Sequence, residues 1–373
     1  MNRSELKDAN RIVIKIGSSL LNRKYRQHVE ELIHQVHEFM NGDKEIVLVS
    51  SGAIFFGMQE LHKTSVPETL PQKQATAAVG QPKLMKFYQE EFNRLGLDTA
   101  QVLLTRDGIH NRQTYLNASN TMNSLLEMGV VPIVNENDTV ATDEIQFGDN
   151  DTLSVLVTTL VDADLLIILS DVEGLYPGDP AEHAQPLAKV EEIDDEIKEI
   201  AGPADRDSST VGGMITKIQA AETVTSSGTP MVIAAGKEKN VLARIINGEE
   251  VGTLFVPRRG TEAIRGRKRW IGYHLLPKGY IQVDSGAVTA IENRGTSLLP
   301  SGVMRADGQF ERGDAVKILT PDEEEFARGL TNYNRQEVND LKGCQTDEIS
   351  DILGHHYFDE IIHRVTMVVF PDE

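Results

Sequence analysis

Short apolar runs alternate with segments of helical periodicity from the start of the chain to about residue 257. Most of the runs are unbroken rather than alternating, which is typical of strands covered on both faces of a sheet. The runs are residues 11–17, 45–50, 101–105, 130–135, 164–171 and 230–235. We interpret each of them as a strand.

Apolar side chains recur at helical spacing between these runs. The clearest groups are Val29, Leu32, Ile33, Val36 and Met40, then Leu116, Met122, Leu125 and Leu126, then Met214, Ile218 and Ala221. Strands that alternate with helices predict an α/β fold, in which a mostly parallel open sheet is sandwiched between helices. Ligands of such sheets usually bind beyond the carboxyl ends of the strands. The residues that follow each run are therefore the candidates for a functional site.

The composition changes at Arg258. Six basic residues and one acid lie between positions 258 and 270, and glycines then punctuate short alternating stretches such as 280–283 and 315–319. Frequent turn signals between short strands are typical of small β domains. We therefore predict one α/β domain over residues 1–257, a basic linker over 258–277, and a small, mostly β domain over 278–373.

Charge and cysteine content narrow the class of protein. The 373 residues include 37 Lys and Arg against 57 Asp and Glu, a formal net charge of −20, which disfavours non-specific binding to nucleic acid or to anionic membranes. The single cysteine, Cys344, allows no intrachain disulfide and no multi-cysteine zinc site. No apolar run is long enough for a signal peptide or a membrane span, so we expect a reduced, cytoplasmic protein with no membrane partner.

Two common nucleotide-binding loops are absent from the sequence. No two glycines are separated by a single residue, which excludes a G-x-G-x-x-G loop. The only Gly-Lys pair is followed by Glu238, which excludes a Walker A loop. A nucleotide would have to be held by another device.

Lys15 lies inside the first apolar run, and Ser51 follows the second. A buried lysine is costly to desolvate unless an anion or an acid meets it, so Lys15 is a candidate for binding a negative group. The alternative is a lysine on an edge strand whose ammonium group reaches water. For Ser51 and its neighbours the alternative is an ordinary helix N-cap.

Two dense clusters of Asn and Asp begin at the end of the fourth run, over residues 135–138 and 148–151. Such side chains suit the ammonium and carboxylate groups of an amino acid, or a hydrated Mg²⁺ ion. They are also common in turns and helix caps, but two clusters so close together favour a site. The candidates are Asn135, Asp138, Asp149, Asn150 and Asp151.

The fifth run ends in Ser170 and Asp171, and a glycine pair opens a later helical segment. Backbone N–H groups of two glycines can approach a phosphate at the positive end of a helix dipole, and a lysine in the following turn can reach the transferred group. The candidates in this segment are Val211, Gly212, Gly213, Met214, Thr216 and Lys217.

Taken together and in this order, the clusters resemble the amino-acid kinase family over essentially the whole chain. The resemblance rests on VIKIGSS, VSSGAI, QATAAVGQ, LLTR, PIVNEND, FGDNDTLS, GGMITK and GTLF. The last domain resembles the PUA type, named for pseudouridine synthase and archaeosine transglycosylase, on YIQVDSGA, GTSLLPSG and FERGDAV. One departure is the phosphate loop, where Thr210-Val211 stands in place of the family's usual Gly-Thr.

The resemblance implies that ATP, with Mg²⁺, phosphorylates the γ-carboxylate of L-glutamate to γ-glutamyl phosphate, the first step of proline biosynthesis. That carboxylate is already ionised at neutral pH, so the reaction needs positioning and charge neutralisation but no general base. The residues implied to be catalytic are Lys15 and Lys217, which would flank the transferred phosphoryl group, and Asp151, which would hold both lysines. Those implied to bind glutamate are Ser51, Asn135, Asp138, Asp149 and Asn150. Those implied to bind ATP are Lys15, Ser170, Asp171, Val211, Gly212, Gly213, Met214, Thr216 and Lys217. We predict no direct protein ligand for a metal ion.

The resemblance also implies partners. Proline is expected as a feedback inhibitor that overlaps the glutamate site, and a homo-oligomer, dimer or tetramer, is expected in solution. Because the acyl phosphate is labile, glutamate 5-semialdehyde dehydrogenase is expected as the partner that consumes it.

Two alternatives remain open. The nearest is another amino-acid kinase, chiefly acetylglutamate kinase, which normally lacks a PUA-like tail; Asp138 and Asp149 fit a free amine better than an acylated one. The other is RNA binding by the second domain, supported by the basic stretch 258–270. The 9 Lys and Arg against 18 Asp and Glu from residue 274 to 373 disfavour it, because a face that follows phosphates is normally net basic.

Overall fold

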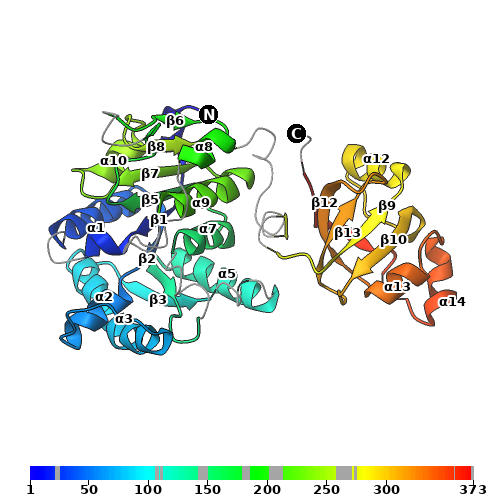
Figure 1. The fold of residues 1–373 in the computed structure, drawn as a ribbon, viewed down its shortest axis with the longest axis horizontal. Coiled ribbons are helices and arrows are strands. Elements are labelled where there is room, and N and C mark those ends of the chain that lie inside the picture. The colour runs from blue at the N-terminus through cyan, green and yellow to red at the C-terminus, as the bar shows by residue number, and fades with distance from the viewer. Residues whose placement is uncertain are drawn as a thin grey trace. The chain divides into compact units, whose positions relative to one another are not determined.

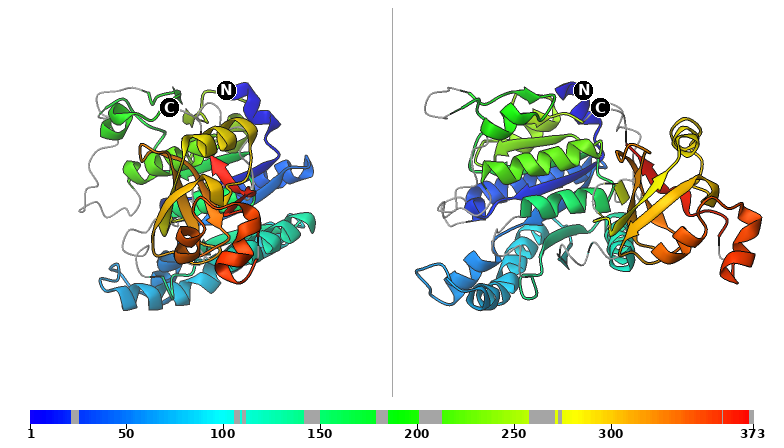
Figure 2. Two further views of the ribbon diagram at one scale, coloured as in Figure 1. Left: turned by 90° about the vertical axis from the view of Figure 1, so that its right-hand side faces the viewer. Right: turned by 45° about the vertical axis from the view of Figure 1, so that its right-hand side comes forward.

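The computed structural model describes residues 1–21, 26–105, 109, 112–141, 150–178, 185–200, 213–257, 271–272, 275–356 and 358–370. The chain forms two compact units, Met1–Arg259 and Gly260–Glu373, which are seen from three sides in Figures 1 and 2. Most of the predicted linker 258–277 lies outside the described residues.

An eight-stranded sheet runs through the first unit in the order β3-β4-β2-β1-β5-β7-β8-β6. Neighbouring strands are parallel except β7 and β8. The strands are β1 (Arg11–Ile16), β2 (Glu45–Ser50), β3 (Thr99–Leu104), β4 (Val131–Glu136), β5 (Leu165–Ser170), β6 (Lys189–Val190), β7 (Met231–Ala235) and β8 (Thr253–Phe255). All six predicted strands are confirmed. The apolar pattern missed β6 and β8 because two and three residues are too short to show a period.

Helices cover both faces of this sheet (Figure 1). They are η1 (Arg3–Asp8), η2 (Ser18–Leu21), α1 (Arg26–Asn41), α2 (Ala53–Glu60), α3 (Leu70–Asn93), α5 (Arg112–Glu127), α7 (Asn150–Leu160), α8 (Asp195–Ile200), α9 (Met214–Ser226) and α10 (Val241–Ile246). Helices α1, α3 and α10 share one buried core with the sheet, whereas α5, α7 and α9 contact the strands and one another. The three predicted helical groups form α1, α5 and α9.

The pleat of β1 explains where Lys15 lies. Ile12, Ile14 and Ile16 belong to the core beneath α1 and α3, and side chains of neighbouring residues point to opposite faces. Lys15 therefore lies on the face covered by α7, with 7% of its surface exposed. Because β1 lies between β2 and β5, the edge-strand interpretation of this lysine is wrong.

Two glycines allow α2 and α3 to cross closely. A Cβ on Gly80 would lie 1.8 Å from the carbonyl oxygen of Ala53 and 2.3 Å from the backbone nitrogen of Gly57. Only glycine permits this approach without moving a backbone. The close crossing fixes the position along α3 of the following residue, Gln81, which contacts the end of β4.

The second unit contains a five-stranded sheet in the order β10-β9-β11-β12-β13. Its strands are β9 (Gly279–Val283), β10 (Val303–Gly308), β11 (Ala315–Leu319), β12 (Glu325–Thr331) and β13 (Ile362–Val369), with helices α12 (Ser285–Arg294), η4 (Pro300–Gly302), α13 (Arg335–Asp340), η5 (Thr346–Glu348) and α14 (Ile349–Leu353). The expectation of a mostly β unit is confirmed. Cys344 packs against its hydrophobic core, and burial raises the pKa of the thiol, as expected for a packed residue rather than a nucleophile.

Candidate functional site

Two lysines from different elements meet one buried carboxylate. Asp151 lies in the first turn of α7 and is completely buried. One of its oxygens forms an ion pair with the Nζ atom of Lys15, and the other lies 3.1 Å from the Nζ atom of Lys217. Thr216 also donates a hydrogen bond from Oγ1 to the second oxygen, at 3.1 Å. The cluster therefore joins β1, α7 and α9.

The cluster carries one positive charge in excess. Burial by itself would raise the pKa of Asp151, but the charges and hydrogen bonds of Lys15 and Lys217 outweigh burial and hold that pKa well below its ordinary value. The carboxylate is thus ionised and faces two ammonium groups, which are only 7% and 4% exposed. Charges shielded from water interact strongly with an incoming anion. The arrangement suits a phosphoryl group.

Asp151 and Lys217 each stand in the first turn of a helix. Asp151 stands in the first turn of an eleven-residue helix, where the helix dipole favours a negative side chain. Lys217 stands in the first turn of α9, which begins after Gly213 as its N-cap. The free N–H groups at that end can bind phosphate oxygens, so the lysine and the helix terminus serve the same ligand.

A chain of side-chain amides borders the cluster. The Nδ2 atom of Asn150 donates to Oγ of Ser51 at 2.8 Å and to Oδ1 of Asn135 at 3.0 Å. The Nδ2 atom of Asn135 in turn donates to Oε1 of Gln81 at 2.8 Å. Asn150 is the neighbour of Asp151 in α7, so the amides and the lysine cluster lie at the same edge of the sheet.

The turn that carries Ser51 is held in place by buried groups. Gly52 adopts a φ of +111°, a conformation that favours glycine. The hydroxyl of Ser50 donates to the carbonyl of Ser51 at 2.9 Å and lies 2.7 Å from the hydroxyl of the fully buried Tyr88. Helix α2 has Gly52 as its N-cap and no capping side chain, so the interpretation of the serines as an N-cap is wrong.

Asp138 follows β4 in the turn that begins at Asn137. Burial raises its pKa to about 6. Within the described part of the chain, its carboxylate has no counterion and no hydrogen bond. The residue is half-buried, and a charged carboxylate that is shielded from water without such a partner is destabilising by itself and is stabilised by an ammonium group.

Residues at the end of β5 complete the same edge. Ser170 is buried and donates from Oγ to Oδ1 of Asp171 at 3.0 Å, whereas Asp171 is exposed. Their strand is the direct neighbour of β1, and Ile16 pairs with Leu169. Gly213 and Met214 stand at the start of α9. The predicted nucleotide residues that the structure describes thus lie at the carboxyl edge of the sheet or beside Asp151.

Several predicted residues lie outside the described part of the chain. They are Asp149, Val211 and Gly212, together with the altered loop position Thr210 and the basic stretch 258–270. Among the described residues, no group of three His, Cys, Asp or Glu side chains could hold a metal ion, and no helix has the length and apolar character needed to cross a membrane.

Gln81 and Tyr88 were not singled out by the sequence analysis, although both are bonded to the polar residues at the strand ends. Gln81 closes the stretch QATAAVGQ, which contributed only to the family resemblance. Its spacing along a helix says nothing about Asn135, which lies 54 residues later.

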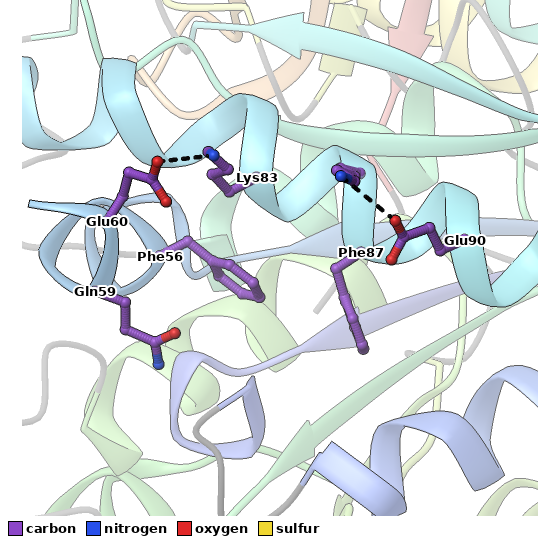
Figure 3. Close-up of a pocket in the computed structure, with 7 residues that line it drawn as sticks. Phe56, Gln59, Glu60, Lys83, Phe87 and Glu90 are labelled. Atoms are coloured by element: carbon purple, nitrogen blue, oxygen red, sulfur yellow. Dashed lines mark ion pairs between the residues drawn. The ribbon is translucent and has the colours of Figure 1, made fainter.

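A surface pocket of about 300 Å³ lies between α2 and α3 (Figure 3). Its lining contains none of the predicted site residues and is bridged by ion pairs from Lys83 to Glu60 and from Lys86 to Glu90. The rings of Phe56 and Phe87 lie next to each other within it, tilted by 36° and with ring centroids 6.0 Å apart. The side chains already satisfy one another, so we assign the pocket no role in the site.

Comparison with known proteins agrees with this geometry. The model of the amino acid kinase family matches residues 10–235, and the model of the PUA domain matches residues 279–353. The chain is 48% identical over 365 residues to the glutamate 5-kinase of Thermoanaerobacter sp. (strain X514), covering 96% of this chain and 97% of that protein. It is 47% identical over 373 residues to the glutamate 5-kinase of Moorella thermoacetica (98% of each) and 44% identical over 375 residues to that of Citrifermentans bemidjiense (99% and 100%).

Proposed function

The chain belongs to the amino acid kinase family, and from this premise we propose that it transfers the γ-phosphoryl group of ATP to the γ-carboxylate of L-glutamate. The buried Lys15–Asp151–Lys217 cluster beside the amide chain carries the proposal. It provides an excess positive charge where two anions must meet. The product, γ-glutamyl phosphate, feeds proline biosynthesis.

The reaction needs no proton transfer. A γ-carboxylate oxygen of glutamate attacks the γ-phosphorus, the bond between that phosphorus and the β,γ-bridging oxygen breaks, and ADP leaves with the bonding electrons. Negative charge builds on phosphoryl oxygens during this step. Lys15 and Lys217 neutralise that charge, and Asp151 keeps both ammonium groups fixed before the substrates arrive.

Bound together with ATP, Mg²⁺ would supply shielding of the phosphate charges. Magnesium in phosphoryl-transfer sites is held largely by substrate phosphates and water. The described residues fit that form of binding, because Asp151 is engaged by two lysines and no described cluster offers three acidic or histidine ligands. The chain's own contribution is the lysine pair and the start of α9.

Substrate choice follows from Asp138. A carboxylate without a described partner attracts the free ammonium group of glutamate and offers nothing to an acylated nitrogen. Ser51, Asn135 and Asn150 supply neutral polar atoms that are bonded to one another at the same edge of the sheet. This set supports glutamate over N-acetylglutamate, the substrate class of the nearest alternative enzyme.

Trapping the acyl phosphate with hydroxylamine tests this function directly. ATP- and Mg²⁺-dependent hydroxamate should form with L-glutamate and not with N-acetyl-L-glutamate or L-aspartate. Signal with N-acetylglutamate alone would overturn the assignment of Asp138. No signal with any of the three would refute the proposed kinase activity.

Feedback inhibition by proline is part of the proposal. Proline carries the same ammonium and α-carboxylate groups as glutamate, so the groups that bind this end of glutamate can also bind proline. Millimolar proline should raise the KM for glutamate while leaving the KM for ATP unchanged. Glutamate turnover that is insensitive to proline would reject it.

The remaining partners stay proposals of the same kind. We propose that the protein forms a dimer or tetramer and is located in the cytoplasm. We also propose that glutamate 5-semialdehyde dehydrogenase consumes its labile product, as suits a biosynthetic kinase. Sedimentation of the full chain, alone and with the dehydrogenase, would test the assembly states. RNA binding by the second unit remains the disfavoured alternative, and a salt-dependent gel shift with structured RNA would test it.

A further inference from the structure

The side-chain amide of Gln81 has one satisfied end and one unsatisfied end. Its Oε1 atom accepts a hydrogen bond from Asn135, as described above. Its Nε2 atom is buried and has no hydrogen-bond partner among the described residues. A buried donor without an acceptor loses the hydrogen bonds that it would make with water, so native proteins rarely keep one without a ligand or another use.

In this network of hydrogen bonds, the atom of Gln81 without a partner is Nε2. Asn150 donates to Asn135, and Asn135 donates to Gln81. Turning over the Gln81 amide alone would place two N–H groups against each other. The chain therefore ends in a pair of N–H donors on Nε2, and an anionic or carbonyl oxygen is the group that they require.

The position of these donors is set before any ligand arrives. Helix α3 crosses α2 closely at Gly57 and Gly80. This contact fixes the position of α3 along its axis, and with it the position of Gln81. The bond to Asn135 fixes the amide plane from the other side. Within one amide, the nitrogen and oxygen are close together, so Nε2 lies within about 5 Å of the Asn135 amide nitrogen.

The two ends of the site favour different parts of the substrate. The lysine cluster takes the reacting γ-carboxylate and the phosphoryl group, so the α-carboxylate and the ammonium group must lie away from it. Asn135 lies near the end of β4, Asp138 follows that strand, and Asp138 is the group suited to the ammonium. The donor on Gln81, which is bonded to Asn135, is thus on the side of the α-carboxylate.

We propose that Gln81 binds the substrate α-carboxylate through its Nε2 donors and makes the enzyme specific for amino acids in which that group is free. The proposal rests on the proposed glutamate kinase activity and adds a specificity-determining residue to it. It also assigns a function to the last residue of QATAAVGQ.

Kinetics with two substrates test the proposal. L-Isoglutamine has the same ammonium and γ-carboxylate groups as L-glutamate, but an amide replaces its α-carboxylate. Hydroxamate formation is measured for both substrates with the full chain and with Gln81→Glu, Gln81→Met and, as a control, Gln89→Ala. Gln89 lies on the same helix and is exposed.

Gln81→Glu is the most informative variant. Its side chain has the same shape and can still accept the bond from Asn135, but it presents an oxygen where Gln81 presents a donor. We expect kcat/KM for glutamate to fall by roughly 10- to 100-fold, the effect of losing a hydrogen bond to a charged group. We expect the KM for ATP to stay constant and the preference for glutamate over isoglutamine to shrink by a similar factor in both Gln81 variants.

Each other outcome is decisive. If kcat/KM falls equally for both substrates, Gln81 acts only by positioning Asn135, and the proposed contact is wrong. Unchanged kinetics in a folded Gln81→Met protein would also overturn it. If the unaltered protein phosphorylates neither substrate, the proposed function itself fails and this inference fails with it, whereas activity in the unaltered protein keeps the two questions separate.

Discussion

The Nζ atom of Lys217 lies 3.1 Å from the Oδ2 atom of Asp151, although the two residues are 66 positions apart in the chain and belong to different helices. The pair is almost completely buried. A buried ion pair is a poor source of stability in general, because the cost of removing two charges from water offsets their attraction. Together with Lys15, it is better explained as a preformed site for a negatively charged reaction.

Replacing Lys217 tests its role in turnover. Lys217→Ala should lower kcat by at least about 100-fold, because a fixed positive charge near the transferred phosphoryl group is lost. The fold should be retained, since Asp151 keeps its ion pair with Lys15. Lys63→Ala, which alters an exposed lysine of the same unit, serves as the control. An active, well-folded Lys217→Ala protein would contradict the assignment.

Replacing Asp151 should affect stability as well as activity. Asp151→Asn removes the carboxylate that pairs with both buried ammonium groups, so the free energy of unfolding at pH 7 should fall by about 3–5 kcal/mol. Because the pKa of Asp151 is lowered in the folded state, its contribution is present above its ordinary pKa near 4 and is lost as the pH falls through the folded value.

Urea unfolding at pH values from 7 down to 3 measures this effect. The difference in stability between the unaltered protein and Asp151→Asn should shrink on the acid side. The control is Asp8→Asn, at an exposed acid of the first unit, and it should leave the curve unchanged. An Asp151→Asn protein as stable as the unaltered one at pH 7 would show that the ion pairs are not formed.

Asp138 should show the opposite dependence on pH. Its pKa is raised to about 6 in the folded state, so its stabilising contribution is complete below the ordinary value near 4 and is lost as the pH rises through 6. Asp138→Asn should therefore raise the free energy of unfolding at pH 7, by at most roughly 3 kcal/mol. The same change should raise the KM for glutamate.

Steady-state kinetics and urea unfolding at pH 5 and pH 7 check both effects. In the unaltered protein, KM for glutamate should fall as the pH rises through 6, because the ionised carboxylate attracts the substrate ammonium. Asp138→Asn should abolish that step. A variant that is less stable than the unaltered protein at pH 7 would mean that Asp138 has a stabilising partner.

Gly80→Ala tests the close crossing of α2 and α3. The added Cβ would lie 1.8 Å from the carbonyl oxygen of Ala53, so the two helices must separate. We expect a loss of about 1–3 kcal/mol or more in the free energy of unfolding, and a higher KM for glutamate because Gln81 moves with α3. Gly42→Ala, whose Cβ would have no contact under 3.4 Å, should cost far less. Equal thermal stability of the two variants would argue against the tight crossing.

The α/β class of the first unit and the polar residues at its strand ends could be predicted from the order of residues along the chain. Unbroken apolar runs such as that of β5 are long enough to identify a buried parallel strand, and polar residues at the end of a run, such as Asn135 and Ser170, are visible without a structure. These polar residues could be predicted as site candidates because they are adjacent in the sequence to the strands that carry them. Short elements such as β6 could not be predicted, because two residues are too few to show a hydrophobic period.

Which of these residues contact one another depends on the folded arrangement of distant elements and could not be predicted from the chain. Lys15 could have been an edge-strand lysine until the strand order placed β1 in the middle of the sheet. Ser51 was a possible helix cap from the sequence, but the structure has Gly52 at the N-cap of α2 and no capping side chain. The unsatisfied donor of Gln81 is invisible in the sequence, because whether a polar atom has a partner depends on side chains far away in the chain and on burial, and folding alone fixes both.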